Sequence, residues 1–128
     1  MTANLPIPKT ALVVDDSMLI RHSVCRFLEE RDFIVESATN GVEALQVLNN
    51  FVPDIIITDL AMPRMGGAEL VNRIRQLPVF ADTPILVLAA RRSAGDLATD
   101  LPAGTAAVIF KDINIEEQLS KALEATLP

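Results

Sequence analysis

Short apolar segments alternate with longer segments of helical periodicity along this chain. The apolar segments are 11–14, 34–38, 55–58, 85–88 and 106–110. Three of them contain no polar residue, which is typical of strands buried on both faces of a parallel sheet. The pattern predicts an α/β domain in which a strand is followed by a helix five times. Right-handed crossovers would then produce an open, doubly wound sheet with helices on both faces.

Apolar residues recur at helical spacing between the predicted strands. The expected buried faces consist of Ile20, Val24, Phe27 and Leu28, then Leu45 and Leu48, then Leu70, Ile74 and Leu77, and finally Ile115, Leu119, Ala122 and Leu123. Asn114 and Glu117 form a variant of the capping box, which predicts the start of the last helix. The weakest helix is expected at 92–101, where Gly95 interrupts the pattern and Pro102 ends it. The segment 77–84 contains two prolines and is expected to be an irregular surface loop.

Length, composition and charge narrow the class of protein. At 128 residues, half of them apolar, the chain is expected to form a single domain over 1–128 with a core of about 9–127. The net charge of -6 argues against direct nucleic-acid binding, because contacts with the phosphate backbone need clustered Lys and Arg. No apolar run approaches the ~18 residues of a membrane span. We therefore expect a cytoplasmic protein whose partners are proteins or metal ions.

Two residues with reactive side chains are interpreted as structural. Cys25 is the single cysteine of the chain, cannot form an internal disulfide, and lies beside the apolar face of the first helix. His22 points away from that face, so we expect it to be solvated and not to act as a phosphorelay histidine or a metal ligand.

The candidate chemistry lies where strands end. Asp15 and Asp16 directly follow the first predicted strand, and Asp59 directly follows the third. If these strands are neighbours, the carboxylates gather at the edge where open α/β sheets bind ligands. Carboxylates so close together raise one another's pKa and oppose folding unless a cation lies between them. Mg²⁺ is a suitable cation because it prefers oxygen ligands. Lys111 ends the fifth strand, so the parts needed for an aspartyl phosphate would meet in one cavity.

Three motifs in the chain resemble the receiver domains of two-component response regulators. They are VVDDS at 13–17, DLAMPRMGG at 59–67, and a lone Lys after the fifth strand. Within the second motif, Pro63 and the pair Gly66 and Gly67 match the family's turn into the third helix. The resemblance implies a flavodoxin-like (βα)5 fold with a five-stranded parallel sheet in the order 2-1-3-4-5. It also implies a signalling protein that is not an enzyme beyond its own phosphorylation and dephosphorylation.

The resemblance also implies a role for each candidate site residue. Asp59 would be the phosphoacceptor, and Lys111 would pair with the phosphoryl group. Asp16 and Asp59 would bind Mg²⁺ through their side chains, Ala61 through its backbone carbonyl, and Asp15 through water. A histidine kinase or a phosphotransfer protein would supply the phosphoryl group. Phosphorylation would then control an output domain or a partner protein, and a homodimer is a further option.

Departures from the family pattern concern the residues that move on activation. The family usually has Ser or Thr at the end of the fourth strand and Tyr or Phe three residues before the lysine. This chain has Ala89, which lacks a hydroxyl, and Val108, which lacks a ring. We predict that the metal pocket forms but that this conformational relay does not operate. Arg91 and Arg92 are either solvated residues at a helix start or a substitute contact for the phosphoryl group.

A further departure follows the lysine. The family commonly has Pro there, in a cis peptide, whereas this chain has Asp112. Because a cis bond before a non-proline residue costs about 3 kcal/mol, we expect a trans peptide.

Three other functions fit parts of the pattern. A receiver-like interaction module that is recognised without phosphorylation would explain Ala89 and Val108, and it is the main alternative. A phosphatase with an aspartate nucleophile usually has a second acid two residues later, where this chain has Ala61. A flavodoxin-like FMN carrier shares the topology, but the chain has no Trp or Tyr to stack on a flavin.

Overall fold

The fold is a parallel sheet between two layers of helices. The computed structural model describes residues 8–62, 64–90, 102–111 and 114–127. Within them the strands are β1 (Thr10–Val14), β2 (Ile34–Ala38), β3 (Ile55–Asp59), β4 (Ile85–Ala89) and β5 (Ala107–Phe110). All neighbouring strands pair in parallel, in the order β2-β1-β3-β4-β5. The predicted fold class and strand order are confirmed.

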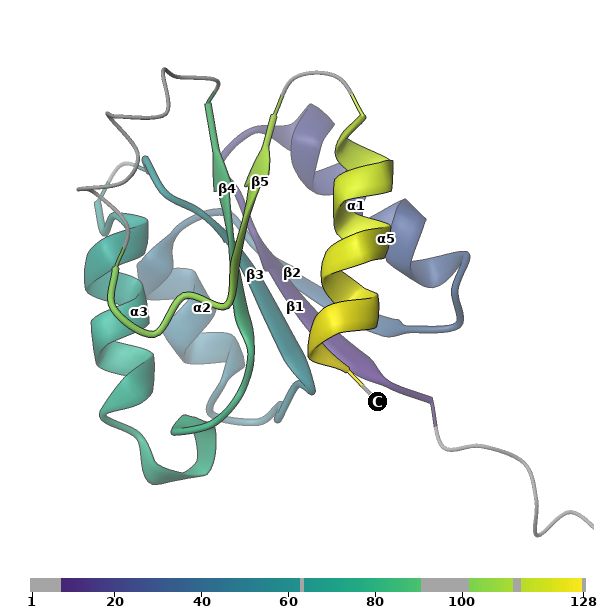
Figure 1. The fold of residues 1–128 in the computed structure, drawn as a ribbon. Coiled ribbons are helices and arrows are strands. Elements are labelled where there is room, and N and C mark those ends of the chain that lie inside the picture. Colours follow the sequence, from purple (N-terminus) through teal and green to yellow (C-terminus); the bar gives the residue numbers. More distant parts are fainter. Residues whose placement is uncertain (1–7, 63, 91–101, 112–113, 128) are drawn as a thin grey trace, which may run out of the picture.

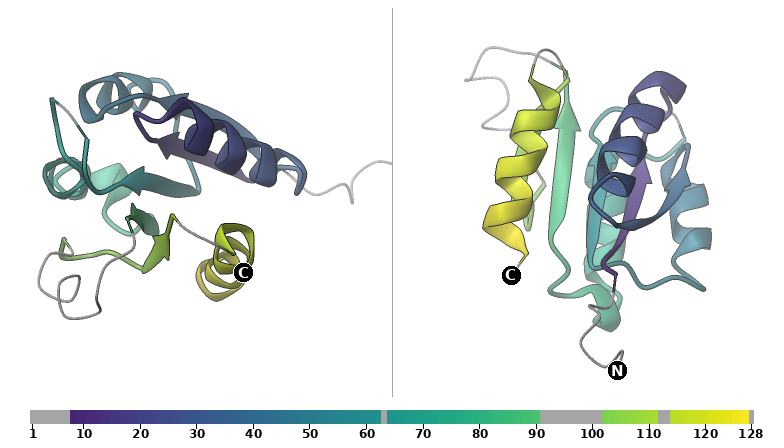
Figure 2. Two further views of the ribbon diagram at one scale, coloured as in Figure 1. Left: turned by 90° about the horizontal axis from the view of Figure 1, so that it is seen from above. Right: turned by 90° about the vertical axis from the view of Figure 1, so that its right-hand side faces the viewer.

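Helices cover both faces of this sheet. They are α1 (Met18–Glu29), α2 (Gly41–Val47), α3 (Gly67–Arg75) and α5 (Ile115–Thr126), together with the short 3-10 helix η1 (Pro78–Phe80) before β4. Figure 1 shows α2 and α3 on one side of the sheet and α1 and α5 on the other, and Figure 2 shows the same layers seen from above and from the side. Because successive strand residues point to opposite faces, Val13 packs in the core beside α1 and α5, and Val14 packs in the core beside α2 and α3.

The buried faces of the first and last helices follow the predicted periodicity. Val24, Phe27 and Leu28 of α1 are buried, with Ile20 partly buried against the same core. Leu119, Ala122 and Leu123 of α5 are buried, with Ile115 partly buried. His22 is exposed and Cys25 is partly buried against this core, as predicted.

The segment after α3 differs from the prediction. Helix α3 ends at Arg75, so Leu77 lies beyond the helix and is 40% exposed instead of belonging to its buried face. The following residues are not wholly irregular, because η1 forms there and places Phe80 in the core. The guanidinium of Arg75 stabilises this turn by donating hydrogen bonds to the carbonyls of Phe80 (2.9 Å) and Thr83 (2.7 Å).

The last helix begins where the sequence predicts, with Asn114 as its N-cap, but the predicted capping hydrogen bond is absent. Asn114 has a left-handed backbone (φ 61°) and its side chain makes no capping hydrogen bond. Side-chain capping typically needs an extended backbone at the N-cap residue, which Asn114 does not have. Extended N-cap residues do cap two other helices: Ser17 accepts from the Ile20 N–H, and Asn40 accepts from the Glu43 N–H.

Several sequence-based expectations fall outside the described residues. These are the helix at 92–101, the role of Pro63 in its turn, the contacts of Arg91 and Arg92, and the peptide before Asp112. Among the helices that are described, none has the length and apolar character needed to cross a lipid bilayer.

Candidate functional site

Three carboxylates meet at the carboxyl end of the two central strands. Oxygen atoms of Asp15, Asp16 and Asp59 all lie within 4.8 Å of one another. This edge of the sheet is uppermost in Figure 1. Strands β1 and β3 pair directly, with Val14 opposite Thr58, so the residues that follow them are side by side. The structure therefore brings together the acids that the sequence singled out.

Asp15 is held in place by the turn that leads into α1. Its Oδ1 accepts a hydrogen bond from the Ser17 N–H (2.8 Å), its own N–H donates to the Ala38 carbonyl (3.1 Å), and its carbonyl accepts from the Arg21 guanidinium (2.8 Å). The side chain is fully buried. Its second oxygen, Oδ2, is buried and has no hydrogen-bond partner among the described residues. That oxygen is available to a cation.

Lys111 supplies one positive charge to this oxygen. Its Nζ lies 2.9 Å from Oδ2 of Asp15 and 2.9 Å from Oδ2 of Asp59. The contact with Asp15 is an ion pair between a fully buried carboxylate and a mostly buried ammonium. Lys111 comes from the end of β5, where its backbone N–H donates to the carbonyl of Ala89 (2.8 Å).

Burial and neighbouring charges shift the pKa values of this pair. Burial raises the pKa of Asp59, the charge of Asp15 raises it further, and the contacts with Lys111 and the Ala61 N–H only partly offset this. Burial alone would lower the pKa of Lys111, but its contacts with Asp59 and Asp15 outweigh that effect and leave it above the ordinary lysine value. The site therefore favours a charged lysine and raises the free energy of an ionised Asp59.

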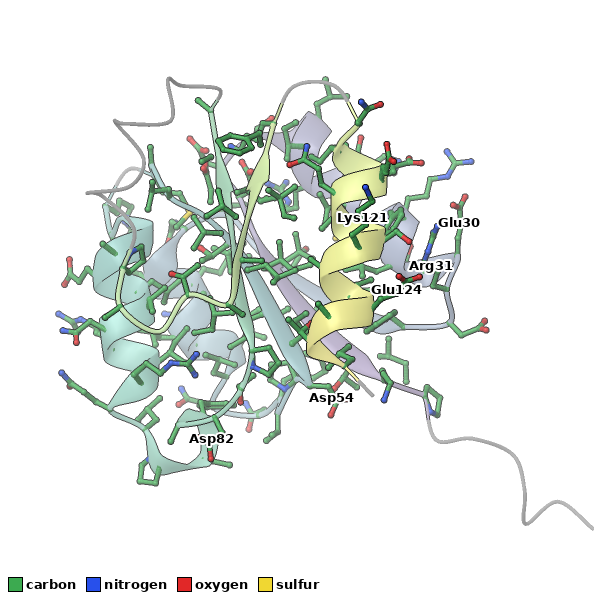
Figure 3. The ribbon with its side chains drawn as sticks, in the orientation of Figure 1. Glu30, Arg31, Asp54, Asp82, Lys121 and Glu124 are labelled. Atoms are coloured by element: carbon green, nitrogen blue, oxygen red, sulfur yellow. The ribbon has the colours of Figure 1, made fainter. Side chains whose placement is uncertain are left out.

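Most charged side chains of the domain lie in a different environment. Figure 3 labels six that project from the surface, and all are exposed: Glu30, Arg31, Asp54, Asp82, Lys121 and Glu124. Asp15 and Asp59 are instead 0% and 4% exposed. Such burial of charge is costly unless the charges are paired or bind a cation, and it usually marks a functional position.

The loop after β3 closes tightly over Asp59. The Ala61 N–H faces Oδ1 of Asp59 at 3.4 Å, and the Gly67 N–H donates to the Leu60 carbonyl at 2.9 Å. A Cβ atom on Gly67 would lie 2.4 Å from the Asp59 carbonyl oxygen, so only glycine fits there. Ala61 itself is exposed at the mouth of the site, and its role as a carbonyl ligand stays a prediction.

The two unusual positions add no polar group to the site. Ala89 ends β4, is 2% exposed, and pairs with Phe110 of β5. Val108 lies on β5 and is partly buried. Neither side chain has a hydrogen-bond donor or an aromatic ring that could respond to a phosphoryl group on Asp59.

Three residues that support the site are not predicted by the sequence patterns described above. Ser17 caps α1, and Ser before a helical segment is the sequence signal for such an N-cap. Arg21 lies in the first turns of α1 and reaches back to the Asp15 carbonyl six residues earlier, a contact that no local pattern indicates. Gln118 contacts the backbone of β5 from within α5, and no local pattern indicates that contact.

The family of the chain follows from comparison with known proteins. The model of the response regulator receiver domain matches residues 11–124. The chain belongs to this family. Receiver domains are signalling modules and not enzymes with a separate substrate, which agrees with the expectation from the sequence.

Individual relatives support the same assignment. The receiver domain is 38% identical over 115 residues to the response regulator MprA of Mycobacterium sp. (strain KMS), covering 90% of this chain and 49% of MprA. It thus spans about half the length of the curated relatives it matches. Its structure is similar to that of the chemotaxis response regulator CheY4 of Vibrio cholerae, with a TM-score of 0.85 and 34% identity over 94% of this chain and 100% of that one. A signal receiver domain of a histidine kinase from Syntrophus aciditrophicus gives a TM-score of 0.79 and 28% identity, covering 91% and 88% of the two chains.

Proposed function

We propose that this receiver domain accepts a phosphoryl group on Asp59 in a Mg²⁺-dependent reaction and thereby controls a protein–protein interaction. The observation that carries the proposal is the cluster of three acidic side chains, of which Lys111 contacts two. A nucleophilic carboxylate beside a cation and a set of metal ligands is the arrangement that aspartyl phosphorylation needs.

The acidic cluster fits Mg²⁺. All its side-chain donors are carboxylate oxygens, which hard divalent cations prefer. Two of the carboxylates are buried with one ammonium between them, and the exposure of Asp16 leaves room for the waters that Mg²⁺ usually retains. Asp16 and Asp59 would bind the ion with their side chains, Ala61 with its carbonyl and Asp15 through water. The bound ion would neutralise charge on the oxygens of the phosphoryl group.

The protein's own residues have distinct tasks in the proposed reaction. A carboxylate oxygen of Asp59 forms the new bond to phosphorus as the bond between phosphorus and the donor histidine nitrogen breaks, and the imidazole leaves. Lys111 already contacts Asp59, so its ammonium is placed to pair with the added phosphoryl oxygens. The Ala61 N–H helps to orient the carboxylate through its other oxygen, Oδ1.

The proposed partners follow from membership of the family. The donor would be a histidine kinase or a phosphotransfer protein in the cytoplasm. The curated relatives are about twice as long as this chain, so an output domain is one proposed target of the signal, and a partner protein or a second receiver is another. The receiver unit itself would comprise residues 1–128.

Labelling with acetyl phosphate tests the proposal directly. We expect stoichiometric, Mg²⁺-dependent incorporation of one phosphoryl group, lost in Asp59→Asn and retained in Asp82→Asn, an exposed acid away from the cluster. Absence of labelling in the folded wild-type protein, or labelling of Asp59→Asn, would contradict it.

A phosphorylation-independent interaction module is the second candidate, favoured by Ala89 and Val108. If the conformational relay is absent, beryllofluoride with Mg²⁺ should change NMR signals around Asp59 but leave residues beyond the end of β4 unchanged. Ala89→Thr would restore a hydroxyl, and we expect the changes to extend further in that variant. Large changes beyond β4 in the wild-type protein would show that the relay operates without the hydroxyl and the aromatic ring that Ala89 and Val108 lack.

A further inference from the structure

Gln118 of α5 holds the last residue of β5 by both of its backbone groups. The Phe110 N–H donates to Oε1 of Gln118 at 2.9 Å, and Nε2 of Gln118 donates to the Phe110 carbonyl at 3.1 Å. Strand β5 lies at the edge of the sheet, so this side of Phe110 faces away from β4. The amide of Gln118 takes the place that a further strand would occupy at this one residue.

The next residue along the chain is Lys111. Its N–H donates to the Ala89 carbonyl at 2.8 Å, on the opposite side from Gln118. The backbone is therefore held by α5 at Phe110 and by β4 at Lys111, directly before the lysine side chain extends into the acidic cluster. A lysine side chain has a long flexible stem, so the position of its Cα decides which atoms the ammonium reaches.

The position of Lys111 affects both buried carboxylates of the site. Its Nζ lies 2.9 Å from both buried carboxylates, and Ala89 cannot contribute a side-chain hydrogen bond to a phosphoryl group. A small displacement of the strand end would change both ion pairs together.

We propose that Gln118 is a positioning residue for Lys111, acting through the backbone of Phe110. The hydrogen-bonded amide sets where β5 ends and thereby holds the ammonium between Asp15 and Asp59. The effect on phosphorylation rests on the function proposed above, whereas the effect on the lysine does not.

The test compares three variants of the whole chain. Gln118→Leu keeps the approximate size but loses both hydrogen bonds, and Gln118→Glu keeps an acceptor for the Phe110 N–H. Thr126→Val is the matched control, because it removes the bond from Thr126 Oγ1 to the Ala122 carbonyl near the other end of α5. The readouts are the ¹⁵N-detected ammonium signal of Lys111 in metal-free protein, the rate of acetyl phosphate labelling, and the urea unfolding midpoint.

We expect Gln118→Leu to broaden or remove the Lys111 ammonium signal and to slow labelling about tenfold, since small misplacements of a catalytic group have effects of this size or larger. Gln118→Glu should recover part of both, and Thr126→Val should change neither. An unchanged ammonium signal and labelling rate in folded Gln118→Leu would overturn the proposal, as would equal losses in Thr126→Val. If Gln118→Leu does not fold, the Gln118→Glu comparison decides alone. If wild-type protein is not labelled but the ammonium signal responds as expected, the proposed function fails and the positioning role stands.

Discussion

The ammonium of Lys111 lies 2.9 Å from Oδ2 of Asp59 and links the ends of β5 and β3 across the intervening strand β4. The same nitrogen lies 2.9 Å from Oδ2 of Asp15. Two buried carboxylates so close together repel each other, and the lysine offsets that repulsion when no metal is bound. Lys111 and a divalent cation therefore stabilise the same group of charges.

Removing this ammonium should destabilise the metal-free protein. We expect Lys111→Met to lower the free energy of unfolding by about 3 kcal/mol, because one partner of a buried ion pair is lost. Lys121→Met is the control: Lys121 pairs with Glu117 on the surface, where a pair contributes about 0.5 kcal/mol. Urea unfolding in EDTA measures both, and added Mg²⁺ should narrow the gap for Lys111→Met. Equal small losses in the two variants would contradict this account.

The raised pKa of Asp59 predicts how stability depends on pH. The folded protein keeps this proton to a higher pH than the unfolded chain, so the contribution of Asp59 to stability falls as the pH rises from about 4 through the raised pKa. Asp59→Asn removes that penalty. The metal-free variant should be more stable than wild type at neutral pH, and the difference should vanish below about pH 4.

Lys111 changes stability in the same direction as Asp59, but at alkaline pH. Because its pKa is raised in the folded state, its contribution is fully present below the ordinary lysine pKa and is lost as the pH rises through the folded value. Unfolding curves of wild type, Asp59→Asn, Lys111→Met and the surface control Asp82→Asn from acid to alkaline pH check both expectations. A metal-free Asp59→Asn that is less stable than wild type at neutral pH would show that burial is not the dominant effect.

Asp16 should matter for metal binding but not for folding. It is the exposed member of the acidic cluster, so Asp16→Asn is expected to change stability by no more than about 0.5 kcal/mol. Losing one of few charged ligands should weaken Mg²⁺ binding by about tenfold or more. A Mg²⁺ titration followed by NMR compares this variant with Asp82→Asn, which should bind as wild type does. Unchanged affinity in Asp16→Asn would remove this residue from the metal site.

The two glycines at the start of α3 should respond differently to alanine. A Cβ on Gly67 would lie 2.4 Å from the Asp59 carbonyl oxygen and 2.8 Å from the Leu60 Cα, whereas on Gly66 the nearest atom would be 3.7 Å away. Gly67→Ala is expected to cost about 1–3 kcal/mol, the range for forcing extra atoms into a packed region. Gly66→Ala should be tolerated. Urea unfolding of the pair checks this, and similar losses would mean that the loop adapts.

The sequence by itself determined the five strands, the helices α1, α3 and α5 to within a few residues, and the acidic edge of the sheet. Short apolar runs predicted the central strands because a strand of a parallel sheet that is covered by helices is buried on both faces. Helical periodicity identified the buried faces of α1 and α5. The motif after β1 placed Asp15 and Asp16 at a strand end, and that placement depends only on neighbouring residues.

The tertiary structure decided the features that depend on contacts between distant segments. The left-handed backbone of Asn114 overrode the capping pattern, and the contacts of Arg75 shaped the turn in which Phe80 is buried. Lys111 lies between Asp15 and Asp59 because of the strand order. Gln118 forms hydrogen bonds with the backbone of Phe110 because α5 packs beside β5. Local patterns specify backbone conformation. The pairing of strands β1, β3, β4 and β5 specifies which side chains meet, because it sets the distances between residues that are far apart in the sequence.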